Sequence, residues 1–157
     1  RKMKETIKGT YYLNLAGHLF LFFCGIGFAI FIFINRVEFI NINIFGKIGG
    51  IIFVIFILIG LIILIILSLK EVIKLMKDYK SIKANKYITI IGKVIKFRRN
   101  RDPETGLQMN NRPIVLVKDT NEKIELFTHS ILRVGHSYIF NYLKNSKIAE
   151  AVEECIE

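Results

Sequence analysis

The chain has 157 residues, of which 52% are hydrophobic, and it carries a formal net charge of +10 at pH 7. The apolar residues are concentrated in the first 69 positions, while residues 70–157 are polar enough to form a small water-soluble unit. This uneven composition excludes a uniform globular domain. The sequence holds no motif for nucleotide binding or nucleophilic catalysis, so we expect a protein that is not an enzyme.

Two long apolar runs fill the first half of the chain, Tyr11–Ile34 and Ile48–Leu69, and neither contains Asp, Glu, Lys or Arg. A helix needs about 20 mostly apolar residues to cross a bilayer, and only helices or closed barrels satisfy their backbone polar groups there. We therefore predict a transmembrane hairpin over residues 1–83 with a loop at 35–47. A signal peptide fits poorly, because the first run exceeds an apolar core of about 7–15 residues and no cleavage pattern follows it.

Basic residues lie mainly at the two outer ends of this hairpin. Four of the first eight residues are Lys or Arg, and residues 70–86 contain six Lys, whereas the loop holds only Arg36 and Lys47 against Glu38. Lys and Arg near membrane ends are enriched on the cytoplasmic side. We therefore predict a multi-pass protein of the cell inner membrane with both termini in the cytoplasm.

The first apolar run contains two polar side chains, Asn14 and His18, which are four residues apart and so share one helical face, with Gly25 about two turns further along it. One interpretation is a helix-packing seam that faces the second span or a partner. The other, which we favour, places both polar groups at headgroup level beside Tyr11 and Tyr12. No charged residue accompanies His18 in the run, so a proton relay is not expected.

Helical periodicity continues past the second run. Val72, Ile73, Met76, Tyr79 and Ile82 recur at three- and four-residue spacing with lysines between them, which predicts an amphipathic helical extension. Its lysines suit anionic headgroups, and we favour ordinary anchoring over recognition of a specific lipid.

From residue 84 onward the apolar pattern alternates instead. We predict strands at 87–97, 114–118, 123–128, 137–143 and 148–152, with Gly92 marking a bulge or bend and a long polar loop at 98–111. Several short strands separated by turn signals predict a soluble all-β barrel of the SH3-like or OB-like type over residues 84–157.

The order of these segments resembles a known family. The chain reads Gly92-Lys-Val94, then Arg112-Pro113-Ile-Val-Leu-Val117, then Ile124-Glu-Leu-Phe127 and Val134-Gly135. This is similar to a widespread bacterial membrane-anchored domain of unknown function, in which a Gly-x-Val strand precedes a Pro-Val-x-Phe-like strand. The resemblance covers Ile88 to Val152, and the chain departs from it at residues 143–147, where the family has an Asp-Pro turn. It implies one or two transmembrane helices with a small cytosolic or extracytosolic β-barrel, and it brings no catalytic residues.

Few residues of the soluble part suggest a metal site or a disulfide. His129 and His136 are seven residues apart and lack a nearby third ligand, so we interpret them as solvated loop histidines and expect no metal or cofactor. Cys24 and Cys155 are isolated, and a disulfide between them is not expected.

One cluster of cations is a plausible binding patch. It lies near Tyr87 and Phe97 and consists of Lys96, Arg98, Arg99, Arg101 and Arg112. Such a patch suits an acidic protein partner or an anionic membrane surface, which we favour over a merely solvated loop, and nucleic acid ranks last.

These observations lead to two hypotheses for the function. The first is an integral membrane protein whose cytosolic barrel binds a protein partner, either as an accessory subunit of a membrane complex or as an immunity-type protein. The second is a membrane-tethered regulator whose barrel binds a small ligand or nucleic acid. Membrane lipid is an expected partner in both, and homo-oligomerisation is left open.

Overall fold

The computed structural model describes residues 2–42, 46–99 and 105–155. Contacts divide the chain into two compact units. One unit, Leu13–Lys74, consists of helix. The other combines Arg1–Tyr12 with Leu75–Glu157 and contains all the strands. We call them the hairpin unit and the sheet unit.

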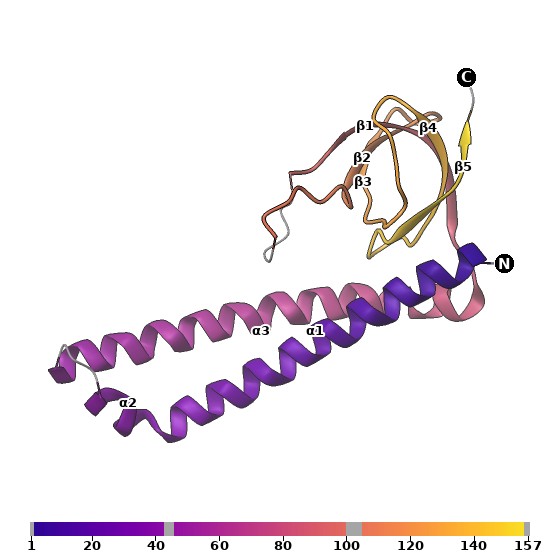
Figure 1. The fold of residues 1–157 in the computed structure, drawn as a ribbon. Helices are drawn as coiled ribbons and strands as arrows, with labels where there is room; N and C mark the ends of the chain where they lie inside the picture. The colour runs from indigo at the N-terminus through magenta and orange to yellow at the C-terminus, as the bar shows by residue number, and fades with distance from the viewer. Residues whose placement is uncertain (1, 43–45, 100–104, 156–157) are drawn as a thin grey trace. The chain divides into compact units, whose positions relative to one another are not determined.

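Among the described residues, three helices precede the strands: α1 (Lys2–Ile34), α2 (Arg36–Ile42) and α3 (Gly46–Ala84) (Figure 1). The two predicted long helices are confirmed, and the lysine-rich extension is a continuous part of α3. Most of the predicted loop is helical, however, because α2 follows α1 after a single turn residue, Asn35. Backbone bonds carry the chain across this turn, from the Asn35 amide to the Phe31 carbonyl and from the Phe39 amide to the Asn35 carbonyl.

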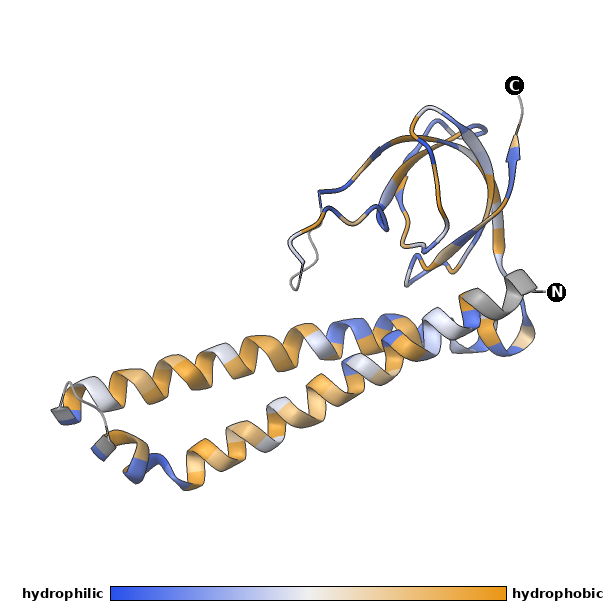
Figure 2. Cartoon of the chain, in the orientation of Figure 1, coloured by the Kyte–Doolittle hydropathy of each residue, from blue (hydrophilic) through white to orange (hydrophobic). Residues whose placement is uncertain are grey.

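Both long helices are long and apolar enough to cross a membrane, over Ile7–Ile34 and Gly46–Ala84. In each, only 11% of the most apolar window is buried inside the chain, whereas the core helix of a soluble protein is mostly buried. Figure 2 shows the apolar colour running around both helices through the hairpin unit. Phe20, Phe56 and Ile48 are 67%, 76% and 77% exposed. So much apolar surface is unusual for a protein surrounded by water.

The sheet unit contains five antiparallel strands in the order β3-β2-β1-β4-β5. All five predicted strands are present, as β1 (Ile88–Phe97), β2 (Pro113–Val117), β3 (Lys123–Glu125), β4 (Ser137–Tyr142) and β5 (Ala149–Cys155).

The predicted closed barrel is wrong, because the sheet is open. The edge strands β3 and β5 form no ladder with each other, and β3 has only three residues to offer. Beyond β3 the chain touches the start of β5 at one isolated parallel bridge, Phe127 to Ile148. There the Phe127 amide donates to the Lys147 carbonyl and the Phe127 carbonyl accepts from the Ala149 amide, both at 2.8–2.9 Å.

The core lies on one face of this sheet, which we call the core face, and the opposite side is the outer face. The segment 126–136, named here the cover segment, places Leu126 and Leu132 in that core. The other members of the core cluster are Val94, Val115, Tyr138, Phe140, Tyr142 and Ala149. The cover segment therefore shields the apolar face that a closed barrel would have enclosed.

Gly92 does not mark the bulge, which contradicts the sequence-based prediction. It pairs in regular register with Val117 and Tyr138, and the irregularity lies between Val94 and Lys96. Glycine is required at position 92 because there is no room for a side chain: a Cβ there would collide with Cγ1 of Val115.

The bulge decides which side chains of β1 reach the outer face. Val94 pairs with Val115 on the core face, and after the irregularity Lys96 pairs with Ile114 and Phe97 with Pro113. Because one extra residue interrupts the alternation, Phe97 returns to the core side and Lys96 points outward.

Helical residues of the sheet unit are joined to the strands through a buried carboxylate. Asp78 on α3 is 1% exposed, and it accepts hydrogen bonds from the turn between β4 and β5. The donors are the Asn145 amide at 3.1 and 3.2 Å, the Asn145 side-chain amide at 2.7 Å and the Ser146 amide at 2.7 Å. In the same unit the Tyr11 hydroxyl donates to the Leu75 carbonyl at 2.8 Å.

Candidate functional site

The outer face of β1, β2 and β3 gathers cations from three strands. Residues paired across an antiparallel sheet share one face, and Lys93 pairs with Leu116, which pairs in turn with Lys123. Beside this row, Lys96 pairs with Ile114, which pairs with Glu125. We call the whole set the cationic face; its basic members are Lys93, Lys96, Arg98, Arg112, Lys118 and Lys123.

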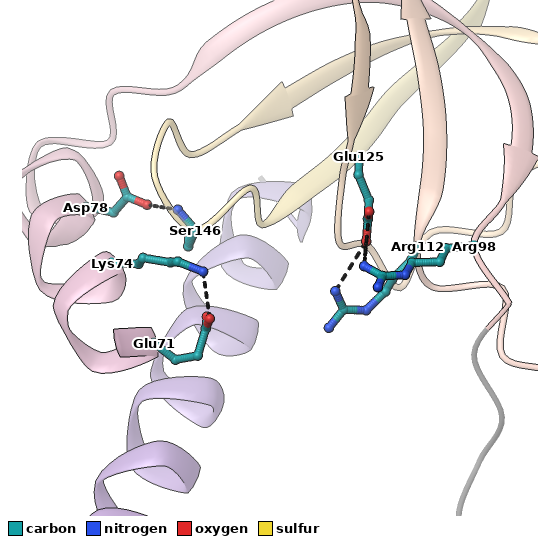
Figure 3. Close-up of polar contacts among 7 residues, drawn as sticks. All are labelled: Glu71, Lys74, Asp78, Arg98, Arg112, Glu125 and Ser146. Atoms are coloured by element: carbon teal, nitrogen blue, oxygen red, sulfur yellow. Dashed lines mark hydrogen bonds and ion pairs between the residues drawn. The ribbon is translucent and has the colours of Figure 1, made fainter. Parts of the chain in front are cut away.

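Arg98 and Arg112 are placed by the ends of β1 and β2, where the Arg98 amide donates to the Arg112 carbonyl at 2.8 Å. Both guanidinium groups turn toward Glu125 of β3 (Figure 3). Arg98 Nη1 lies 3.1 and 3.3 Å from the two Glu125 carboxylate oxygens, and Arg112 Nη1 lies 3.3 Å from Oε1.

Arg98 and Arg112 share one carboxylate, so these two cations have a structural partner. The three side chains are 61%, 44% and 36% exposed for Arg98, Arg112 and Glu125, so each pair contributes at most about 1 kcal/mol to stability. One negative charge against two positive ones leaves the cluster basic, and the pairs orient the guanidinium groups.

The remaining predicted patch residues are distributed as follows. Lys96 and Arg99 are exposed, and Arg101 lies outside the described residues. The Arg112 guanidinium also stands over the Phe127 ring at 5.6 Å, and His129 meets that ring edge-on at 5.2 Å.

Sequence reasoning missed half of the cationic face. Lys93, Lys118 and Lys123 belong to different strands or strand ends, and only the register places them beside Lys96 and Arg98. The alternation of β1 was readable, but the bulge that brings Lys96 to this face carries no signature in its residues, Val94-Ile-Lys96.

Aliphatic side chains fill the spaces between these cations. Ile91 is 37% exposed, and Ile114 and Leu116 are partly buried. Within β1, β2 and β3 the one aromatic residue, Phe97, packs against the core instead. The strand residues of the cationic face are therefore aliphatic and basic, and the ring that adjoins them, Phe127 beside Arg112, lies outside the strands.

The soluble histidines lie apart from each other. His129 faces Phe127, while Nδ1 of His136 contacts the Glu154 carboxylate in a short ion-pair geometry. Within residues 2–42, 46–99 and 105–155, no three His, Cys, Asp or Glu side chains are grouped so that they could hold a metal ion.

In the hairpin unit, Gly25 lies close to side chains of α3. It is buried, and a Cβ added there would lie 2.9 Å from Cγ1 of Ile65 and 3.2 Å from Leu64. Asn14 and His18 are partly buried, and Nδ1 of His18 has no hydrogen-bond partner among the described residues. A packing role for Asn14 and His18 stays a prediction.

Asp78 is the residue of greatest structural consequence that the sequence did not reveal. It sits among lysines in the amphipathic part of α3, where an acid is normally a solvated helix residue. A nearby group is similarly enclosed: the Tyr87 hydroxyl is buried without a partner among the described residues, and burial together with the Glu150 charge raises the pKa of Tyr87 above its ordinary value of 10.0.

Comparison with known proteins identifies no relative of the chain: no family model matches it, and neither a curated protein nor a solved structure does. The resemblance to the bacterial membrane-anchored family therefore stays a prediction.

Proposed function

We propose that this chain is a non-enzymatic integral membrane protein that presents its sheet unit to bind an acidic protein partner. The partner docks on the cationic face, and the chain serves as an accessory subunit of a membrane complex or as an immunity-type protein that blocks a membrane-active target. The observation that carries the proposal is the gathering of six basic side chains on the outer face of β1, β2 and β3, where the pairing places Glu125 among them.

The membrane part of the proposal rests on the hairpin unit. Its exposed surface is dominated by Phe, Ile and Leu side chains, and hydrocarbon is the solvent in which such a surface is stable. The lysines of α3 beyond Leu69 and those near the start of α1 favour a topology with both termini on the cytoplasmic side of the inner membrane.

Charge and shape favour a protein over nucleic acid as the partner. A sheet face with cations between aliphatic side chains complements an acidic segment that also carries apolar residues. Single-stranded nucleic acid would gain the cations but no stacking surface from the strands. A tethered regulator that binds nucleic acid or a small ligand is the alternative, and the same experiment separates the two.

The test is charge reversal on the cationic face in the full chain. Purification in mild detergent should recover one protein with the wild type, and Lys93→Glu with Lys123→Glu should abolish its recovery. Lys144→Glu is the control, since it reverses an exposed charge on the turn between β4 and β5, outside the cationic face, and it should leave recovery intact. Recovery that is unaffected by the double reversal, or recovery of nucleic acid instead of protein, would overturn the proposal.

The topology has a separate test. In a chain whose Cys24 and Cys155 are replaced, single cysteines are introduced at Asn41 and at Glu122, both of which are exposed. In intact cells a membrane-impermeant thiol reagent should label position 41 and leave position 122 unlabelled until the membrane is opened. The reverse pattern would show that the hairpin is inverted.

A further inference from the structure

The cover segment carries the most exposed large apolar side chain of the sheet unit. Ile131 is 97% exposed, and Val134 three residues later is 55% exposed. Leu132, which lies between them, is 9% exposed and belongs to the core. The segment thus turns one aliphatic residue inward and its two aliphatic neighbours outward.

Hydrogen bonds hold this part of the segment on both sides of its apex. Ser130 Oγ accepts from the Ala151 amide of β5 at 3.1 Å, and the Arg133 amide donates to the Tyr138 hydroxyl at 3.1 Å. Further along, the Gly135 amide donates to the Val94 carbonyl at 2.8 Å. The exposure of Ile131 is therefore imposed by a pinned backbone and does not result from a loose loop.

Chemistry favours a bilayer over a protein as the occupant of this apex. Energetic centres of protein interfaces are rich in Trp, Tyr and Arg, and Val is under-represented there. Residues 129–136 hold one Arg but no Trp, Tyr or Phe. The outward apolar residues here are Ile and Val. Residues 129–136 include Arg133 and no Asp or Glu, a combination that suits the boundary between acyl chains and anionic headgroups.

The covalent tether keeps such a surface within reach. The apolar run of α3 ends at Leu69 and the helix ends at Ala84, so helix extends about 20 Å beyond the run. Only three residues then separate α3 from β1. The sheet unit is therefore joined to the apolar run by a short tether.

We infer that the apex of the cover segment, Ile131 with Val134 and Arg133, inserts into the interface of an anionic bilayer as a second membrane contact of the chain. This inference rests on the membrane anchoring in the proposed function, but not on the protein partner, which uses the opposite face of the sheet. Docking of the apex restricts the orientation of the sheet unit and leaves the cationic face available.

The natural absence of tryptophan provides the probe. Three variants of the full chain, each with one tryptophan, are reconstituted in nanodiscs of phosphatidylcholine and phosphatidylglycerol with brominated acyl chains. Phe56→Trp reports on the apolar run of α3, Ile131→Trp on the apex, and Leu107→Trp on a loop residue that is 70% exposed outside the cover segment.

The inference predicts bromine quenching and blue-shifted emission for Phe56→Trp and Ile131→Trp, and neither effect for Leu107→Trp. Replacing phosphatidylglycerol by phosphatidylcholine, or adding Arg133→Glu, should reduce quenching at position 131 alone. Quenching at position 56 with solvent-like emission at position 131 would overturn the inference while anchoring stands. Equal quenching at 131 and 107 would overturn the assignment to the apex, and no quenching at 56 would refute the anchoring itself.

Discussion

The hairpin unit and the sheet unit use the same kinds of side chain in opposite ways. Phe56 in the hairpin unit is 76% exposed, whereas Phe140 at the centre of β4 is fully buried. The hairpin unit thus turns its apolar surface outward, and its stability depends on what surrounds it. The sheet unit encloses its apolar residues and depends on its own packing.

This contrast shows which exposed apolar residues are informative. In the hairpin unit an exposed Phe or Ile is the rule and indicates only the surrounding solvent. In the sheet unit the other exposed isoleucines, Ile88, Ile91 and Ile95, are only 36–38% exposed, so Ile131, at 97%, stands out beside the buried Leu132. Five predictions test the comparison, from the largest expected effect to the smallest.

Truncation of matched phenylalanines should affect the two units differently. Phe140→Ala removes a fully buried ring and should destabilise the sheet unit by about 3–5 kcal/mol. Phe56→Ala removes an exposed ring and should leave the unfolding of the sheet unit unchanged. Chemical denaturation of the full chain in detergent, followed by near-ultraviolet circular dichroism, measures both effects. Equal losses of stability in the two variants would contradict the comparison between the hairpin unit and the sheet unit.

Removal of the Asp78 carboxylate should loosen the connection between α3 and the sheet. Asp78→Ala leaves the partly buried amides of Asn145 and Ser146 without their acceptor and should cost about 1–3 kcal/mol. Hydrogen exchange at those two amides should accelerate. Asp119→Ala, in the exposed turn after β2, is the control and should change neither stability nor exchange; protection that persists without Asp78 would show that the turn is held by other contacts.

Two glycines offer a steric comparison. Gly92→Ala forces a methyl group against Val115 and should destabilise the sheet unit by about 1–3 kcal/mol. Gly27→Ala in the hairpin unit meets nothing within 4 Å and should be tolerated. Thermal unfolding monitored by circular dichroism distinguishes them, and a neutral Gly92→Ala would mean that β1 and β2 can separate without loss.

Adjacent arginines test whether the cationic face is structural or only binding. Arg98→Gln breaks an exposed pair with Glu125 and should cost no more than about 1 kcal/mol, while Arg99→Gln should have no measurable effect on stability. Arg98→Gln should weaken partner recovery in a salt-sensitive manner, and Arg99→Gln, at a position next to the cationic face, should weaken it less. If Arg98→Gln lost much of its melting temperature while partner binding stayed intact, the cluster of Arg98, Arg112 and Glu125 would have a structural role and no binding role.

The smallest effect concerns alkaline pH. The pKa of Tyr87 is raised in the folded chain, so above pH 10 the unfolded chain releases this proton first and stability falls as pH rises. Tyr87→Phe removes this contribution and also the buried hydroxyl. The variant should match the wild type at neutral pH and lose less stability between pH 10 and 11; identical slopes in denaturation titrations would show that Tyr87 ionises equally in both states.

The long helices and the strand segments could be predicted from sequence because each has a local cause. Uninterrupted apolar runs favour helix wherever backbone groups must be satisfied internally, and alternation with turn residues favours strands. Closure of the sheet could not be predicted in this way. It depends on whether β3 and β5 are long enough and near enough to pair, which no local pattern reports.

By itself, then, the sequence determined two apolar helices, five strands and a strongly basic balance, since these follow from composition and periodicity. The tertiary structure alone decided how the pieces meet. The bulge after Val94 turned Lys96 outward, the register placed Lys93 beside Lys123, and Asp78 found its donors 67 and 68 residues away along the chain. These contacts are selected by the energies of long-range pairing, and the local sequence pattern does not predict them.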